Sequence, residues 1–147
     1  MSAWDAVSAI SSMSGAVTVT AALIYTARQV REARRTRAVT ALLAIHKAWN
    51  ASELNRTRRR LKGGEFDDVD QMSIADRNAI GDVLNQAELV GFLVDRRLVS
   101  LHDVMSLFPS IPFSYEKALP HIEERRRAFP MYARNVEVLV RRYETQR

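Results

Sequence analysis

The hydrophobic and polar pattern begins with a long uncharged segment near the start of the chain. Residues 6–27 run for 22 positions without one side chain that is charged at neutral pH. A helix of that length rises about 33 Å, close to the roughly 30 Å thickness of a bilayer's hydrocarbon core. Its serines and threonines can bond to helix carbonyls or to a neighbouring helix. The pattern therefore predicts a transmembrane anchor.

After the anchor the pattern stays helical, and no strand-like alternation with hairpin signals occurs. Apolar positions recur at three- and four-residue steps between Ala27 and Asn50, so the anchor is expected to continue as a long neck helix. The predicted class is all-α. A single N-terminal transmembrane helix (residues 1–27) leads into an Arg-rich neck (28–50) and a small cytoplasmic helical bundle (51–147).

Capping signals divide the bundle into helices. Three serines stand where helices are expected to begin, two of them with an aspartate three residues later, as in a capping box. They are Ser52, Ser73 and Ser100. The first of these helices is expected to end at Gly63. Two more helices are expected before and after Pro130, and Pro120 predicts a kink or a break in the former.

The strongest amphipathic stretch follows Ser73. Its apolar positions recur with the helical period at Ile80, Val83, Leu84, Ala87, Val90, Gly91, Val94 and Leu98. Leu89, Phe92 and Leu93 widen this stripe, so the second half of the helix is expected to form the core of the bundle.

Charge placement predicts the orientation of the anchor. Asp5 is the only charge before it, whereas five arginines lie among the ten residues after it. Positive side chains stay on the cytoplasmic side, so the N-terminus is expected outside and the bundle inside the cell. Four residues are expected at the membrane interface: Trp4, Tyr25, Arg28 and Arg31. The alternative is that the uncharged segment is a core helix of a soluble bundle.

The net charge of +5 conceals three blocks. Residues 1–62 carry eleven basic and three acidic side chains (net +8), residues 63–124 four and twelve (net −8), and residues 125–147 seven and two (net +5). We expect the acidic middle to pair with the basic ends, within one chain or between subunits. The competing interpretation is a nucleic-acid-binding stripe formed by Arg56, Arg58, Arg59 and Arg60. The absence of cysteine excludes disulfides and thiolate chemistry.

No motif predicts a catalytic, cofactor-binding or metal site, so we expect no enzymatic activity. His121 and Glu124 are spaced to touch one cation, but no second pair at helical spacing completes a metal site. Glu88 is embedded among apolar neighbours and, if buried, needs a cation, for which Arg126 or Arg127 is the candidate. A buried Glu88–Arg126 ion pair would fix helix register or mark a ligand pocket. The alternative is a half-exposed carboxylate on a helix flank.

The order of elements and three short phrases resemble a known family. The phrases are residues 42–50 (LLAIHKAWN), residues 85–94 (NQAELVGFLV) and residues 120–123 (PHIE) followed by Arg126. Together with the anchor and the Arg-rich neck, they make the chain similar to the bacterial domain-of-unknown-function 4760 family. The resemblance implies a membrane-anchored helical domain of the bacterial inner membrane, without an assigned activity.

Two functions from different classes remain open. The first is a single-pass membrane-anchored scaffold or adaptor, whose partners are the lipid bilayer and either another protein or a second copy of the chain. The second is a soluble helical regulator or nucleic-acid-binding protein, with the uncharged segment buried in its core. Nucleic acid is the less favoured partner, because the acidic block can neutralise the basic ends.

Overall fold

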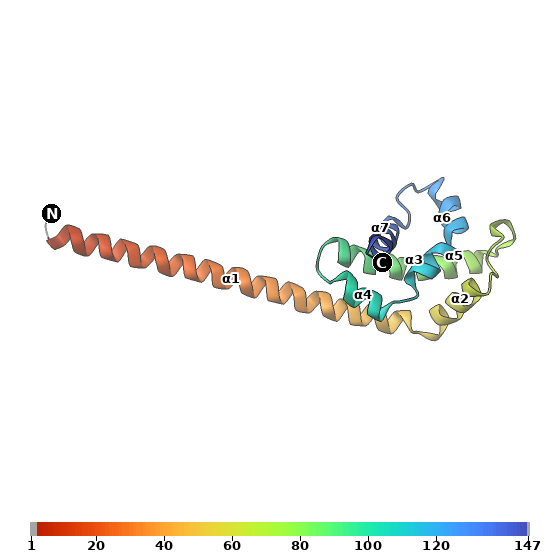
Figure 1. Cartoon of the computed structure of the whole chain (residues 1–147), viewed down its shortest axis with the longest axis horizontal. Coiled ribbons are helices and arrows are strands. Elements are labelled where there is room, and N and C mark those ends of the chain that lie inside the picture. The colour runs from red at the N-terminus through yellow and green to blue at the C-terminus, as the bar shows by residue number, and fades with distance from the viewer. Residues whose placement is uncertain (1–2, 147) are drawn as a thin grey trace. The chain divides into compact units, whose positions relative to one another are not determined.

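The computed structural model describes the backbone of residues 3–146 and the side chains of residues 22–146. Every regular element in this part of the chain is a helix (Figure 1), which confirms the predicted all-α class. The elements are α1 (Ala3–Trp49), α2 (Ser52–Lys62), the 3₁₀ helix η1 (Val69–Gln71), α3 (Ile74–Asp95), α4 (Leu101–Leu107), α5 (Ile111–Lys117), α6 (Leu119–Arg126) and α7 (Arg134–Thr145).

The chain divides into two compact units, Met1–Arg37 and Ala38–Arg147, and α1 contributes residues to both. In the first unit the described side chains, residues 22–37, are all exposed. Among the residues that the structure describes, no helix combines the length and the apolar character needed to cross a bilayer. The side chains of residues 6–21 of the predicted anchor lie outside the described part of the chain.

The core of the second unit begins with the last turns of α1. The periodicity assigned residues 38–49 to the neck, but Ala38, Leu42 and Trp49 are buried. Positions three, four or seven residues apart fall on one side of a helix, so these side chains face the same neighbours. The Trp49 ring meets Phe108 edge to face, with 5.9 Å between ring centroids. The end of α1 is thus part of the folded bundle.

Helices α3 and α7 supply most of the remaining core. The buried residues of α3 follow the predicted stripe: Ile80, Val83, Leu84, Ala87, Val90, Gly91 and Val94. The buried residues of α7 are Val136, Leu139 and Val140. The predicted widening of the stripe is confirmed at Leu93, which packs against the core, but is wrong at Leu89 and Phe92, which are 49% and 42% exposed. They lie on the outer side of α3, which also carries the exposed Asp82 and Asn85.

Local capping chemistry sets several helix boundaries. The Oγ atoms of Ser73 and Ser100 each accept the backbone N–H of the aspartate three residues later, at 3.1 Å and 3.0 Å. Both predicted capping boxes are therefore confirmed. The predicted cap at Ser52 is wrong, because Ser52 is already helical and the flanking Ala51 has no side-chain acceptor.

The chain breaks rather than kinks near Pro120. α5 ends at Lys117 and α6 begins at Leu119, so the proline lies in the first turn of α6. The first N–H groups of a helix have no partner within it, and the missing N–H of proline therefore costs no hydrogen bond there.

Ion pairs join the charge blocks, as the sequence predicts. Arg60 pairs with Glu65 at 2.8 Å and with Asp76 at 2.7 Å, which links the first block to the second. Arg142 pairs with Asp95 at 2.9 Å, which links the third block to the second. Part of the charge asymmetry is thus neutralised inside the second unit.

Candidate functional site

Glu88 on α3 lies half-buried against the first turn of α7. Its Oε1 accepts hydrogen bonds from the backbone N–H and the side-chain amide of Asn135, both at 3.0 Å. Its Oε2 accepts the backbone N–H of Val136 at 2.9 Å. Glu88 therefore caps α7 from another helix, and its carboxylate lies at the positive end of the helix dipole.

This cap compensates for the way in which α7 begins. The N-cap residue is Ala133, which has no side-chain acceptor and adopts a left-handed backbone conformation with φ of 58°. The first N–H groups of a helix need partners from outside it. Gly91 allows the close approach of the two helices, because a Cβ atom there would lie 2.5 Å from the carbonyl oxygen of Asn135. Glu88 and Gly91 together hold the first turn of α7 against α3.

The predicted ion pair between Glu88 and Arg126 is wrong, because the two side chains have different partners. Nε of Arg126 donates to the carbonyl oxygen of Tyr132 at 2.9 Å, and its Nη2 donates to Glu137 at 2.6 Å. The expectation of a cation applied to a buried carboxylate, whereas Glu88 is half-buried, which is closer to the alternative of a half-exposed carboxylate on a helix flank. The backbone donors of a helix N-terminus satisfy it instead.

The connection between α6 and α7 (residues 127–133) is held by turn hydrogen bonds. The N–H of Phe129 donates to the carbonyl of Arg125, and the N–H of Tyr132 donates to the carbonyl of Phe129, both at 2.9 Å. Phe129 and Met131 are each 60% exposed. The exposed basic residues of this region are Arg125, Arg127 and Arg134. Helical spacing from Ile122 predicts Phe129 on the core side, which is wrong because Phe129 is exposed. The sequence signal of this stretch is the run RRRAFPMYAR, in which arginines flank apolar residues without a carboxylate.

His121 on α6 is 1% exposed, and neither of its ring nitrogens has a hydrogen-bond partner. Burial lowers the pKa of His121, and the positive charge of Arg125 adds to this effect. Glu124 pairs with Arg77, and the hydrogen bond from Arg77 lowers the pKa of Glu124. Of the two residues considered as metal ligands, His121 is thus buried without a hydrogen-bond partner, whereas Glu124 is already paired with Arg77. Within residues 22–146, no group of three or more His, Asp or Glu side chains is placed to hold a metal ion.

Arg58 on α2 ties three elements together. Its guanidinium carbon lies 4.4 Å from the centroid of the Trp49 ring. The guanidinium also donates to the carbonyl of Trp49 at 2.9 Å, to Asn55 at 3.0 Å and to Ser110 at 2.9 Å. Burial lowers the pKa of Arg58. This arginine therefore holds α1, α2 and the start of α5, which removes it from the nucleic-acid stripe considered above.

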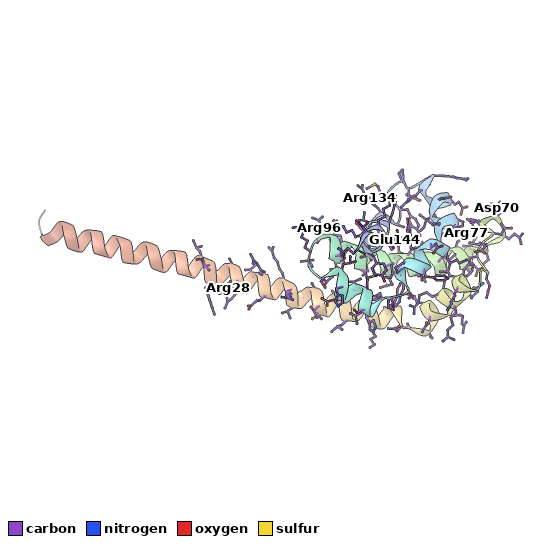
Figure 2. All side chains as sticks on the ribbon, in the orientation of Figure 1. Arg28, Asp70, Arg77, Arg96, Arg134 and Glu144 are labelled. Carbon is purple, nitrogen blue, oxygen red and sulfur yellow. The ribbon has the colours of Figure 1, made fainter. Side chains whose placement is uncertain are left out.

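Three of the four predicted membrane-interface residues have described side chains. Tyr25, Arg28 and Arg31 are exposed, and Figure 2 shows Arg28 extending away from α1. The Tyr25 hydroxyl oxygen accepts a hydrogen bond from Nε2 of Gln29 at 2.8 Å. Trp4 lies outside the described side chains.

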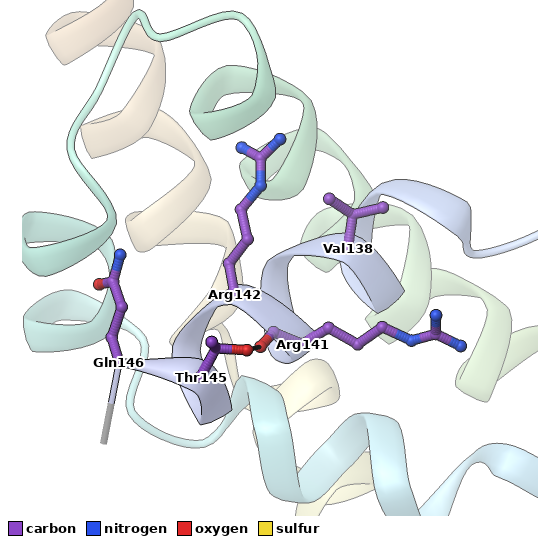
Figure 3. Close-up of a pocket in the computed structure, with 5 residues that line it drawn as sticks. All are labelled: Val138, Arg141, Arg142, Thr145 and Gln146. Carbon is purple, nitrogen blue, oxygen red and sulfur yellow. Dashed lines mark hydrogen bonds between the residues drawn. The ribbon is translucent and has the colours of Figure 1, made fainter.

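A surface hollow of about 310 Å³ lies along α7 (Figure 3). Its lining residues are Val138, Arg141, Arg142, Thr145 and Gln146. Arg141 pairs with Glu137, and Arg142 pairs with Asp95. Both guanidinium groups at the hollow are therefore already bound to carboxylates of the same chain.

Comparisons with known proteins give one match. Residues 16–143 match the model of a protein family described as a domain of unknown function, DUF4760. No curated protein and no solved structure matches the chain. The matched segment includes Glu88, Gly91 and Arg126, which hold the α3–α7 junction and the α6–α7 connection.

Proposed function

This chain belongs to the DUF4760 family, a domain of unknown function, and from that premise we propose that it is a single-pass membrane-anchored interaction protein. In this proposal α1 carries the anchor, and the second unit binds another protein or a second copy of the chain. The role is that of a scaffold or adaptor without a catalytic step.

The observation that carries the proposal is the uncharged segment and the arginine cluster that follows it. Residues 6–27 lack charged side chains, and the backbone is helical throughout them as part of α1. The arginines that follow are exposed: Arg28, Arg31, Arg34, Arg35 and Arg37. An uncharged helix of about 33 Å followed by positive charge is the pattern of a spanning segment at its cytoplasmic boundary.

The same charge distribution supports an orientation. Asp5 precedes the segment and the arginines follow it, so the N-terminus lies outside a bacterial inner membrane and the second unit lies in the cytoplasm. Tyr25 and Arg28 then lie at the inner headgroup level, and Trp4 lies at the outer one.

Exposed apolar side chains on the second unit support a protein partner. Val39 and Leu43 on α1 are 45% and 56% exposed, and Leu89 and Phe92 on α3 are 49% and 42% exposed. Within each pair the two side chains lie one helical turn apart, and exposed apolar patches on a folded protein are typical of interaction sites. The guanidinium carbon of Arg96 lies 5.3 Å from the centroid of the Phe92 ring, so a polar group borders this surface.

Alkaline carbonate extraction of bacterial membranes tests the anchor. The full chain should stay in the pellet and dissolve only in detergent. Val17→Arg places a charge at the centre of the segment, at a cost of about 2.5–3.5 kcal/mol, against a total apolar contribution of about 2–4 kcal/mol. This variant should move to the supernatant, whereas the control Val39→Arg, on the exposed part of α1, should not. Extraction of the unaltered chain without detergent would refute the anchor and favour a soluble helical regulator.

Single-cysteine labelling tests the orientation and is unambiguous because the chain has no cysteine of its own. A membrane-impermeant maleimide should label Ser2→Cys in intact spheroplasts, and should label Glu116→Cys, at an exposed position of α5, only after lysis. The opposite pattern would refute the orientation. Affinity capture from detergent extracts, with Leu89→Ser and Phe92→Ser as matched surface variants, then tests the partner site: the variants should lose the captured protein or copy.

A further inference from the structure

We propose that the α6–α7 connection is a second, peripheral membrane contact, at which Phe129 and Met131 enter the headgroup region of an anionic bilayer between flanking arginines. This contact belongs to the second unit and is distinct from the anchor. Only the affinity of this contact depends on the proposed function, because an anchored chain meets a higher local concentration of lipid.

The apolar part of the argument is the exposure of two side chains at the same connection. Phe129 and Met131 are each 60% exposed, two positions apart, on either side of Pro130. The connection passes along the outside of the second unit (Figure 1). An exposed aromatic ring gains by entering the acyl boundary, as in interfacial helices. The thioether of Met131 accepts a hydrogen bond from Nη1 of Arg134 at 3.2 Å, so this arginine lies directly beside the apolar pair.

The positive charge of the connection favours binding to anionic lipid. Arg125, Arg127 and Arg134 are exposed, and the sequence from 125 to 134 contains no carboxylate. The exposed carboxylates nearby are Glu123, which precedes the run, and Asp82 on α3, whose charge acts on Tyr132, so the three exposed arginines still outnumber them. Each arginine near an anionic surface strengthens binding about five-fold, so three give about 100-fold.

Arg77 joins the acidic α2–α3 connection to α6, because it pairs with Glu124 and donates to the carbonyl of Val69, so the α6 end of this surface is partly neutralised. The connection between α2 and α3 carries several carboxylates, including Asp70, which lies well apart from Arg134 in Figure 2. Arg126, the remaining arginine of the run, donates to Glu137 and to the carbonyl of Tyr132. It fixes the connection from inside, while its neighbours face outward.

The connection is also held in one conformation before it meets a partner. Its turn hydrogen bonds, from Phe129 to Arg125 and from Tyr132 to Phe129, set the positions of the apolar side chains. At its end, Glu88 holds the N–H groups of Asn135 and Val136. A segment that is ordered in advance loses less conformational entropy on binding.

A fluorescent reporter in the cysteine-free chain tests the contact. Met131→Cys is labelled with a nitrobenzoxadiazole dye, and the full chain is reconstituted in vesicles of phosphatidylcholine alone or mixed with phosphatidylglycerol. The dye should shift to the blue and be quenched by nitroxide-labelled lipid only in the mixed vesicles. The matched control, the same dye on Glu116→Cys, should respond to neither lipid.

One triple variant separates the effect of charge from that of anchoring. The triple variant Arg125→Gln, Arg127→Gln and Arg134→Gln should lose the dye shift with an unchanged melting temperature, whereas carbonate extraction should stay as in the unaltered chain. Failure of the anchor would appear as loss of the chain from phosphatidylcholine vesicles, with the charge-dependent shift retained in the mixed ones.

Two results would overturn the proposal. The dye at position 131 could remain in water in phosphatidylglycerol vesicles, which excludes lipid contact. Alternatively, the dye could be buried equally in micelles and in both vesicles, with burial increasing with protein concentration, which assigns the connection to a second copy.

Discussion

Glu88 provides the sharpest test of how the second unit is held together. Its carboxylate accepts three hydrogen bonds from Asn135 and Val136 at the start of α7, at 2.9–3.0 Å. Loss of an N-cap costs about 0.5–2 kcal/mol, loss of a favourable charge at a helix N-terminus about 0.3–1 kcal/mol, and a buried N–H left unpaired about 1–3 kcal/mol. These effects overlap, so Glu88→Ala should reduce the free energy of unfolding by about 2–4 kcal/mol.

Glu88→Gln separates the contribution of the hydrogen bonds from that of the negative charge. The glutamine oxygen can still accept one N–H, but its amide group directs a donor at the second N–H, and the charge is lost. The expected loss is about 1–2 kcal/mol, between that of alanine and zero. Thermal unfolding of the full chain in detergent micelles, followed by far-ultraviolet circular dichroism, should rank the variants in this order. Exchange of the Asn135 and Val136 amide hydrogens should accelerate in parallel.

The control for these variants is Glu116→Gln, which removes the same charge from an exposed position of α5. It should change the free energy of unfolding by less than about 0.5 kcal/mol. If Glu88→Ala destabilises the chain no more than this control does, or if exchange at the start of α7 is unchanged, Glu88 does not cap the helix.

Three further predictions test neighbouring features. Gly91→Ala should destabilise the second unit by about 1–3 kcal/mol, because its Cβ would meet backbone at 2.5 Å, whereas Gly81→Ala, with no contact closer than 3.7 Å, should stabilise α3 by about 1 kcal/mol in urea unfolding. Arg97→Gly should raise the melting temperature, since the φ of 55° costs a non-glycine residue about 1–2 kcal/mol. Burial lowers the pKa of His121. As the pH falls below about 6.5, His121 therefore takes up a proton in the unfolded chain before it does so in the folded chain. Stability should therefore fall below that pH by up to about 1.4 kcal/mol per unit, and His121→Phe, but not the exposed His102→Gln, should flatten the decline.

Signals within one turn of a helix predicted the fold well. Ser73 and Ser100 bind the N–H groups that the capping rule assigns to them, and the helix before Gly63 ends where expected. Such signals involve atoms that are close in sequence, so a sequence pattern contains both partners. At Ser52 the same rule placed the start of the helix one residue too late, because the serine is the first helical residue and not the N-cap.

Long-range partners were not predictable in the same way. Glu88 was correctly singled out, but its partner is the backbone of α7, which no side-chain pattern specifies. The sequence signal for this contact is Ala133, because a helix that begins without a polar capping residue needs an acceptor from another part of the chain. Likewise, periodicity placed Leu89 and Phe92 beside the core stripe, but it cannot say how much of α3 its neighbours cover.

The cap on α7 and the proposed lipid contact depend on one another through the α6–α7 connection. Arg126 holds one end of the connection and Glu88 the other, so both also set the positions of Phe129 and Met131. Removing the Glu88 carboxylate should therefore weaken the dye response at position 131 in phosphatidylglycerol vesicles, although Glu88 touches no lipid. The loss should be smaller than that of the triple arginine variant, because the arginines and the apolar side chains remain and only their ordering is lost. If the Glu88 variant and the triple arginine variant lost the dye response equally, the lipid contact would depend on a folded α7 rather than on the charge of the connection.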